Sequence, residues 1–207
     1  MAAVLSDPNH SKQRTELTKP ISLIYIMDDI FHVHRTLDEL ILFTDAIKKW
    51  DINAIKHLPS YLKLFYKVIY DITDDISNMV LEEHGWDPSD SLYKSVYGGK
   101  LCDAFLVEAK WKESGKLPGA GEYLKNGVIS SGVHVVFVHI FFLLGQGIIE
   151  ESINLIDSGV SGLITCPATI LRLWDDLGCA AIRLGTRIHE LNHCSKWDKM
   201  LTNVKFT

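Results

Sequence analysis

The feature that most constrains the fold is the spacing of large apolar residues between residues 58 and 85. In the stretch LPSYLKLFYKVIYDITDDISNMVLEEHG these residues recur every three or four positions, which places them on one face of an α-helix. The positions on this face are Leu62, Phe65, Tyr66, Ile69, Ile72 and Ile76. A helix with one apolar face buries that face against other elements, so this stretch predicts a bundle of packed helices.

Start and end signals of helices recur along the chain. We expect the helix KPISLIYIMDDIFHVH to begin near Pro20, because proline suits the first helical turn. Thr36 and Glu39 have the spacing of a capping box, and Pro167 is expected to open the helix PATILRLWDDLG. The glycine pair at residues 98–99 is expected to weaken or bend a helix that would otherwise continue. Alternating apolar runs are scarce and no hairpin signal joins them, so the predicted fold class is all-α.

The length and charge of the chain exclude several classes of protein. Its 207 residues suffice for one domain with a sizeable core. A net charge of −5, without a stripe rich in lysine and arginine, argues against a nucleic acid partner. The four cysteines form no CxxC pair, which favours a reducing compartment over a zinc ribbon or a disulfide framework. The start MAAVLSDPNHSKQR lacks the apolar core of a signal peptide, so no targeting segment is expected in this chain.

One apolar stretch, residues 128–149, has the length of a membrane span. It contains no Asp, Glu, Lys or Arg, and a span needs about 20 mostly apolar residues. Two histidines, two serines and a glutamine lie within it, and no basic cluster flanks it. We therefore expect one buried helix and no membrane span, with a membrane-associated helical protein as the alternative. Its aromatic residues Phe137, Phe141 and Phe142 are expected in the core, as are Trp111 and Trp174.

Two adjacent carboxylates, Asp28 and Asp29, follow the apolar run of the first helix. His32 lies one turn further on, so Asp28 and His32 share a helix face. Two carboxylates at the end of an apolar helix suit Mg²⁺, which takes oxygen ligands and keeps several waters. The alternative is that these acids cap a neighbouring helix or face solvent.

A second acid pair, Asp175 and Asp176, ends the apolar segment ILRLWDD. In a bundle two such helix ends can face each other across a cavity, and two acid pairs could then hold a polyanion through several metal ions. The motif HELNH at residues 189–193 has the spacing of a zinc-binding helix. Because its surroundings are polar and no third ligand follows in helical context, we expect only incidental metal affinity there.

Four segments carry a resemblance to a known family: ELTKPISLIYIMDDIFHVHRTLDELILFTDAI, LCDAFLVEAKW, EYLKNGVISSGVHVV and ILRLWDDLG. In this order they resemble the C-terminal catalytic domain of plant terpene synthases, most strongly the linalool and nerolidol synthases that make acyclic alcohols. The resemblance runs from about Leu5 to Ala180. It predicts a partial terpene synthase helical bundle over residues 1–180 and a divergent, loosely ordered tail over residues 181–207.

The resemblance implies a bundle around an apolar cavity, where three Mg²⁺ (or Mn²⁺) hold the diphosphate of geranyl or farnesyl diphosphate and help it leave. In the acyclic branch, water then adds to the allylic cation and gives a tertiary alcohol. The family holds its ions with a DDxxD motif and an N/D-D-x-x-S/T-x-x-x-E motif. By position, the implied metal ligands are Asp28 and Asp29 in the first motif and Asp175 in the second. The implied compartment is plastid or cytosol.

Three ligand positions of these motifs carry other residues. His32 stands at the last aspartate of the first motif, and Cys179 and Arg183 stand at the hydroxyl and glutamate positions of the second. Imidazole and thiol are poor Mg²⁺ ligands, and a guanidinium cannot be one. The alternative to a terpene synthase that forms an acyclic alcohol is therefore a non-catalytic fragment with weak or no metal binding.

The ends of the resemblance predict a truncated chain. The similarity stops abruptly near residue 180, which suggests a frameshift, a retained intron or a misjoined exon, and Met1 falls inside a helix of the family domain. A bundle that lacks some of its helices exposes apolar faces, so we expect the chain to associate with itself.

Overall fold

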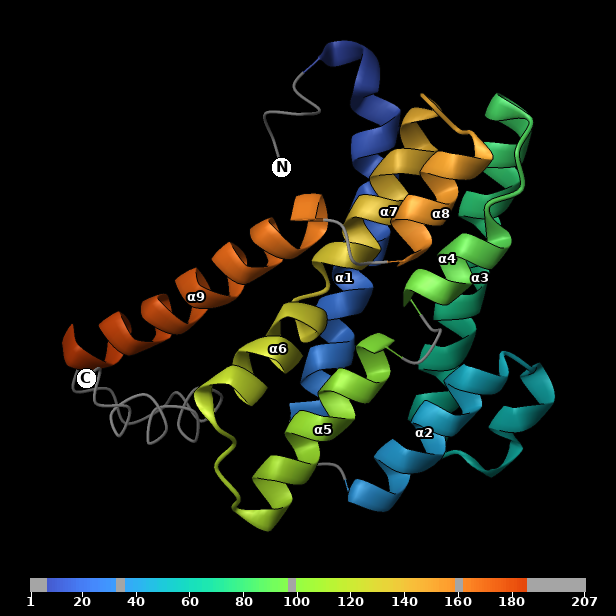
Figure 1. Ribbon diagram of the computed structural model, residues 1–207. Helices are drawn as coiled ribbons and strands as arrows, with labels where there is room; N and C mark the ends of the chain where they lie inside the picture. The colour runs from blue at the N-terminus through green and yellow to red at the C-terminus, as the bar shows by residue number, and fades with distance from the viewer. Residues whose placement is uncertain (1–6, 33–35, 97–99, 159–161, 186–207) are drawn as a thin grey trace.

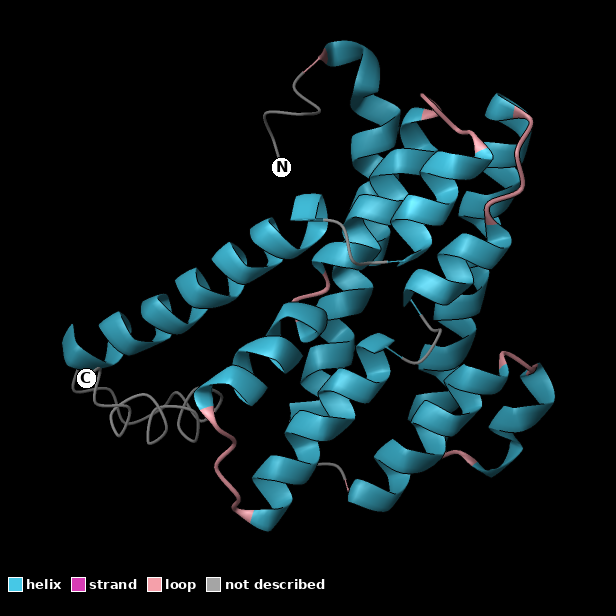
Figure 2. Cartoon of the chain, viewed as in Figure 1, coloured by secondary structure: helices cyan, strands magenta, loops and turns pink. Residues whose placement is uncertain are grey.

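The computed structural model describes residues 7–32, 36–96, 100–158 and 162–185. Over these ranges the chain forms helices joined by short turns and no strand, which confirms the predicted all-α class (Figures 1 and 2). The elements are η1 (Pro8–His10), α1 (Ser11–His32), α2 (Leu37–Lys49), η2 (Ile52–His57), α3 (Ser60–His84), α4 (Ser89–Val96), α5 (Lys100–Ser114), α6 (Ala120–Ser130), α7 (Val133–Leu144), α8 (Glu150–Ser158) and α9 (Gly162–Gly185).

Helix α1 packs against α3, α5 and α7 (Figure 1). The predicted start at Pro20 is wrong, because α1 begins at Ser11 and Pro20 lies buried in its interior. The residues before it include strong helix formers, and tertiary packing compensates for the lost backbone hydrogen bond. Pro167 likewise lies inside α9, which begins at Gly162, so that predicted start is also wrong.

The predicted capping box at the start of α2 and the predicted apolar face of α3 are confirmed. The Thr36 side chain accepts a hydrogen bond from the Glu39 main-chain N–H, and the Glu39 carboxylate accepts one from the Thr36 N–H, as a capping box requires. Helix α3 follows Pro59 and ends at Gly85, whose φ of 71° is a left-handed conformation that favours glycine. Five of the six predicted apolar positions are buried: Leu62, Phe65, Tyr66, Ile69 and Ile76.

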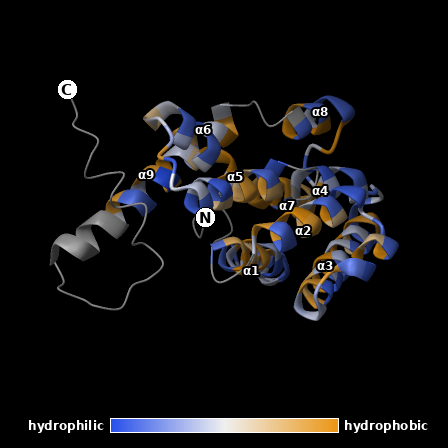
Figure 3. Cartoon of the chain, turned by 90° about the horizontal axis from the view of Figure 1, so that it is seen from below, coloured by the Kyte–Doolittle hydropathy of each residue, from blue (hydrophilic) through white to orange (hydrophobic). Residues whose placement is uncertain are grey.

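An aromatic cluster joins four helices beneath the last turn of α1. Phe31 of α1 contacts Phe43 of α2 and Phe105 of α5, with ring centroids 6.2 and 5.7 Å apart. Phe65 of α3 stacks on Phe43 at 5.9 Å. Burying each of these side chains contributes roughly 1.5–3 kcal/mol, so the end of α1 is fixed relative to α2, α3 and α5. Figure 3 shows the apolar residues of α5 and α7 gathered in the middle of the bundle.

The stretch 128–149 is not one helix, which corrects the expectation of a single buried one. Helix α6 ends at Ser130 and α7 begins at Val133, with Gly132 between them at a φ of 70°. A Cβ at Gly132 would lie 2.7 Å from a methyl group of Ile24, so the turn favours glycine for both conformation and space. Helix α7 itself is largely buried, as predicted: Val138 and Phe142 have no exposed surface.

Two of the aromatic residues expected in the core lie on the surface instead. Phe137 is 40% exposed and Trp174 is 67% exposed, whereas Trp111 is buried as predicted. Both exposed rings point away from the faces by which α7 and α9 pack, so helical spacing alone did not reveal which face is covered.

Helix α9 packs against α6 and α7 along one side and extends away from the remaining helices (Figures 1 and 3). Much of its apolar surface faces outward. The large exposed residues on this surface are Leu163, Ile170, Leu171, Leu173, Trp174 and Leu177. Such a surface agrees with the expectation of exposed apolar faces, and self-association through it stays a prediction.

By length and composition alone, two helical stretches in the described ranges could cross a membrane. Ala120–Leu144 has 56% of its apolar window buried inside the bundle and is divided by the turn at Gly132. Glu150–Gly178 has 14% of its window buried and runs across residues 159–161, which are not described. The expectation of no membrane span stays a prediction.

Several expectations fall outside the described residues. The glycine pair at 98–99 lies there, between the end of α4 and the start of α5, as does the motif HELNH at residues 189–193. The division into a domain over residues 1–180 and a tail over 181–207 stays a prediction, since residues 186–207 are not described.

Candidate metal centre

The acidic end of α1 lies beside α5. Met27 is buried in the core, the following residue Asp28 is partly exposed, and Asp29 is exposed to solvent. The ammonium group of Lys112, on α5, donates a hydrogen bond to the main-chain carbonyl of His32, where a cation suits the negative end of the helix dipole. The last turn of α1 is therefore held against α5 by polar contacts as well as by the aromatic cluster.

His32 bridges two carboxylates. Its Nδ1 lies 3.0 Å from Oδ1 of Asp28 and 2.9 Å from the main-chain oxygen of the same residue. Its Nε2 lies 3.3 Å from Oε2 of Glu108 on α5. Both ring nitrogens face acceptors, so both carry a proton and the ring is positively charged. Burial lowers the pKa of His32, but hydrogen bonds and charges from Asp28 and Glu108 raise it further, to about 10.

Glu108 is a residue of this candidate centre that the sequence did not indicate. Its side chain is almost fully buried, and its second oxygen, Oε1, accepts hydrogen bonds from Asn126 at 3.0 Å and from Ser130 at 2.6 Å, both on α6. One signal could have found it: Glu108 is an acid three residues after Phe105, on the apolar face of α5. A carboxylate on a buried face needs partners, and this one links α1, α5 and α6.

In the second acid pair, Asp176 rather than Asp175 faces the bundle. Asp175 is exposed, whereas Asp176 is buried and accepts hydrogen bonds from the Tyr123 hydroxyl at 2.7 Å and the Arg172 guanidinium at 2.6 Å. The guanidinium also lies over the Tyr123 ring, 5.2 Å from its centroid. Burial raises the pKa of the Tyr123 hydroxyl above its ordinary value, because it disfavours the charged phenolate. Asp176 and Arg172 therefore attach α9 to α6.

The donors in this arrangement do not fit a set of three magnesium ions. The two carboxylates that turn toward the bundle, Asp28 and Asp176, are each bound by a cation of the chain itself, His32 and Arg172. Among the described residues, no group of three or more His, Cys, Asp or Glu side chains is placed to hold a metal. Cys179 and Arg183 lie on α9, but their side chains are outside the described part.

The assignment of Asp28, Asp29 and Asp175 as metal ligands stays a prediction. Asp28 and Asp29 share the last turn of α1, while Asp175 lies on α9, a helix that packs against α6 and α7 rather than against α1. Within the described residues, the contacts that connect the two acidic motifs run through α5 and α6.

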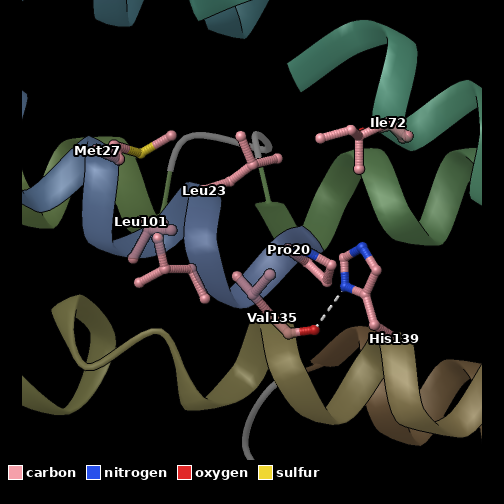
Figure 4. A pocket seen from close by; sticks show the side chains of 9 residues that line it. Pro20, Leu23, Met27, Ile72, Leu101, Val135 and His139 are labelled. Carbon is pink, nitrogen blue, oxygen red and sulfur yellow. Dashed lines mark hydrogen bonds between the residues drawn. The ribbon is translucent and has the colours of Figure 1, made fainter. Parts of the chain in front are cut away.

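A small apolar pocket lies next to this centre, between α1, α3, α5 and α7 (Figure 4). Its lining residues are Pro20, Leu23, Ile24, Met27, Ile72, Thr73, Leu101, Val135 and His139. The Nδ1 of His139 donates a hydrogen bond to the main-chain oxygen of Val135 at 2.8 Å, and burial lowers the pKa of His139 to about 4. The pocket is therefore uncharged, and Met27 in its wall precedes Asp28 directly.

The second acid pair was expected at a helix end, but Asp175 and Asp176 lie in the interior of α9, which runs from Gly162 to Gly185. The comparisons with known proteins agree with the fold. Residues 1–183 match the family model described as "Terpene synthase family, metal binding domain", so the chain belongs to the terpene synthase family. It is 49% identical to the chloroplastic S-(+)-linalool synthase of Arabidopsis thaliana, over 86% of this chain and 31% of that protein. It is 48% identical to the (E)-nerolidol synthase of Cannabis sativa, over 86% of this chain and 32% of that protein.

A solved structure has the same fold. Isoprene synthase from grey poplar leaves, in complex with three Mg²⁺ ions and dimethylallyl-S-thiolodiphosphate, superposes with a TM-score of 0.82 and 33% identity. The match covers 97% of this chain and 38% of that one. The isoprenoid synthase fold predicted from the sequence is thereby confirmed. The chain spans about a third of the length of the curated relatives that it matches.

Proposed function

We propose that the reaction of this protein is the ionisation of geranyl or farnesyl diphosphate to an acyclic terpene alcohol of the linalool or nerolidol type. The bond between the prenyl carbon and the diphosphate oxygen breaks, and diphosphate leaves with the electron pair. Water then adds to the tertiary carbon of the allylic cation and loses a proton. The observation that carries the proposal is the 48–49% identity to a linalool and a nerolidol synthase over 86% of this chain.

The described residues bear on one part of this reaction. The apolar pocket beside Met27 has room for about one water molecule, so it does not itself hold a prenyl chain. By position, Asp28, Asp29 and Asp175 are the carboxylates proposed to hold Mg²⁺ or Mn²⁺, hard ions that take oxygen ligands. Binding an ion at Asp28 requires this carboxylate to separate from His32.

A second candidate function has a specific observation in its favour. The contacts of His32 with Asp28 and Glu108 use the carboxylate that the metal would need, so the chain is alternatively a non-catalytic fragment of such an enzyme with weak or no metal binding. The two candidates share the fold and differ in metal binding and in turnover.

Turnover of geranyl and farnesyl diphosphate by the purified chain with Mg²⁺ distinguishes them, with volatile products identified by gas chromatography. The Asp28→Ala variant tests the acidic end of α1, and Asp45→Ala on the exposed side of α2 is the matched control. The proposal expects an alcohol from the natural chain and from the control but not from Asp28→Ala. If folded, helical protein yields no product, the second candidate is correct and the first is refuted.

A further inference from the structure

We propose that the His32 side chain occupies the cation position at the acidic end of α1, between Asp28 and Glu108, and so competes with a divalent cation for the Asp28 carboxylate. The inference rests on the family's use of metal ions, and it holds whichever prenyl diphosphate is the substrate. It concerns the ion affinity of this chain, whereas the proposed function concerns turnover.

The geometry places the ring where an ion would bind. The two nitrogens of His32 lie 3.0 and 3.3 Å from oxygens of Asp28 and Glu108, which come from different helices. The single positive charge of the imidazolium lies between two carboxylates of separate helices and partly offsets both, at a place where a bridging divalent ion would also contact them. The imidazolium has one positive charge and no lone pair available, so it substitutes for an ion and cannot act as a ligand to one.

The ring is fixed in this position. Its side chain is only 10% exposed, and its Nδ1 also contacts the main-chain oxygen of Asp28 at 2.9 Å. The Phe105 ring meets it edge to face, at 6.1 Å between centroids and an interplanar angle of 88°. A metal ion that binds Asp28 must therefore displace a packed ring rather than a solvated one.

Displacing the ring would also affect Glu108. The Oε1 atom of Glu108 is already bound by Asn126 and Ser130, and its Oε2 atom faces the imidazolium. Without His32 a nearly buried carboxylate would lose its positive partner, which is strongly unfavourable in a buried site. The ion pair with Glu108 therefore makes it less favourable for a metal ion at Asp28 to displace the imidazolium.

A carboxylate at position 32 should allow Asp28 to bind a divalent cation in place of the imidazolium. In His32→Asp the competing cation is gone, and an oxygen donor is added one turn from Asp28, which suits a hard divalent ion. We expect Mn²⁺ to bind His32→Asp at least about tenfold more tightly than the natural chain, the lower end of the effect that partners of metal ligands have on affinity. Binding is measured from the electron paramagnetic resonance signal of free Mn²⁺, without prenyl diphosphate.

Two controls make the result specific to this site. His57→Asp introduces the same side chain at an exposed position of η2, a segment that packs against α2 and α3, and should leave Mn²⁺ binding unchanged. The double variant His32→Asp with Asp28→Asn should lose the gained affinity. Equal Mn²⁺ affinity of His32→Asp and the natural chain, with both proteins helical by circular dichroism, would overturn the inference.

A measurement on the natural chain decides the question if His32→Asp does not fold. Mn²⁺ broadens the nuclear magnetic resonance signals of nearby nuclei, so the ring signals of His32 are compared with those of the exposed His57 during a Mn²⁺ titration. The inference expects His32 to broaden no more than His57. Selective broadening of His32 at lower Mn²⁺ would place an ion beside Asp28 and overturn it. Both experiments omit substrate, so their failure is distinct from a failure to form product.

Discussion

The buried carboxylate of Glu108 gives the most quantitative test of this structure. Truncation in Glu108→Ala removes the acceptor of the Asn126 amide and the Ser130 hydroxyl and one of the two carboxylates that face His32. Breaking a buried pair by removing one charged partner costs about 3–5 kcal/mol. Glu108→Gln keeps an acceptor and loses the charge, and hydrogen bonds to charged groups contribute about 1.5–3 kcal/mol. The expected order of stability is natural chain, Glu108→Gln, Glu108→Ala.

Urea denaturation followed by circular dichroism measures these changes. With a urea slope of about 1–3 kcal/mol per molar, Glu108→Ala should lower the midpoint by at least about 1 M. Glu113→Ala is the matched control, because it removes an exposed carboxylate of the same helix and should change stability by no more than about 0.5 kcal/mol. A midpoint for Glu108→Ala that equals that of the control would refute the reasoning. So would a Glu108→Gln variant as stable as the natural chain.

Three further outcomes follow from the contacts described above. The pKa of His32 is raised from 6.5 to about 10 in the folded chain, so the stability it contributes is complete below pH 6.5 and lost as the pH rises to 10. The difference in urea midpoint between the natural chain and His32→Gln should shrink over that window. Asp176→Asn should destabilise the chain by about 1.5–3 kcal/mol, and Asp175→Asn by less than about 0.5 kcal/mol, by the same denaturation assay. Gly132→Ala should lower the melting temperature, because a left-handed alanine costs about 1–2 kcal/mol and its Cβ would collide with Ile24.

Local signals in the sequence predicted much of the fold. The capping box joins Thr36 and Glu39, which are three positions apart, so its residue types and spacing suffice to predict it. The apolar face of α3 could also be predicted, because apolar residues with a period of 3.6 residues lie on the side of a helix that is buried. The end of α3 falls at Gly85, a residue type that favours the left-handed conformation found there.

The errors have a common physical cause, which is tertiary packing that overrides a local preference. Pro20 is tolerated inside α1, where it lines the apolar pocket, although proline normally marks a helix start. The turn at Gly132 divides an apolar stretch that has continuous helical composition, and it depends on the contact with Ile24 from another helix. Trp174 is exposed because the side of α9 on which it lies packs against neither α6 nor α7.

The candidate site was predicted in part for the same reason. The common face of Asp28 and His32 follows from their spacing on one helix, and the structure confirms it through their 3.0 Å contact. Glu108 lies 76 positions after His32, and the sequence pattern does not predict that α5 packs beside the end of α1. The inward orientation of Asp176 rather than Asp175 likewise depends on Tyr123, a residue of another helix.

The most direct test of the account is the protonation of the His32 ring. In a sample labelled with nitrogen-15, long-range correlation spectra at about pH 8, above the ordinary histidine pKa, distinguish protonated from unprotonated ring nitrogens. The account predicts two protonated nitrogens for His32, because each faces a carboxylate. A single protonated nitrogen on His32 at this pH would contradict the ion pairs with Asp28 and Glu108, and with them the claim that this side chain takes the place of a metal ion.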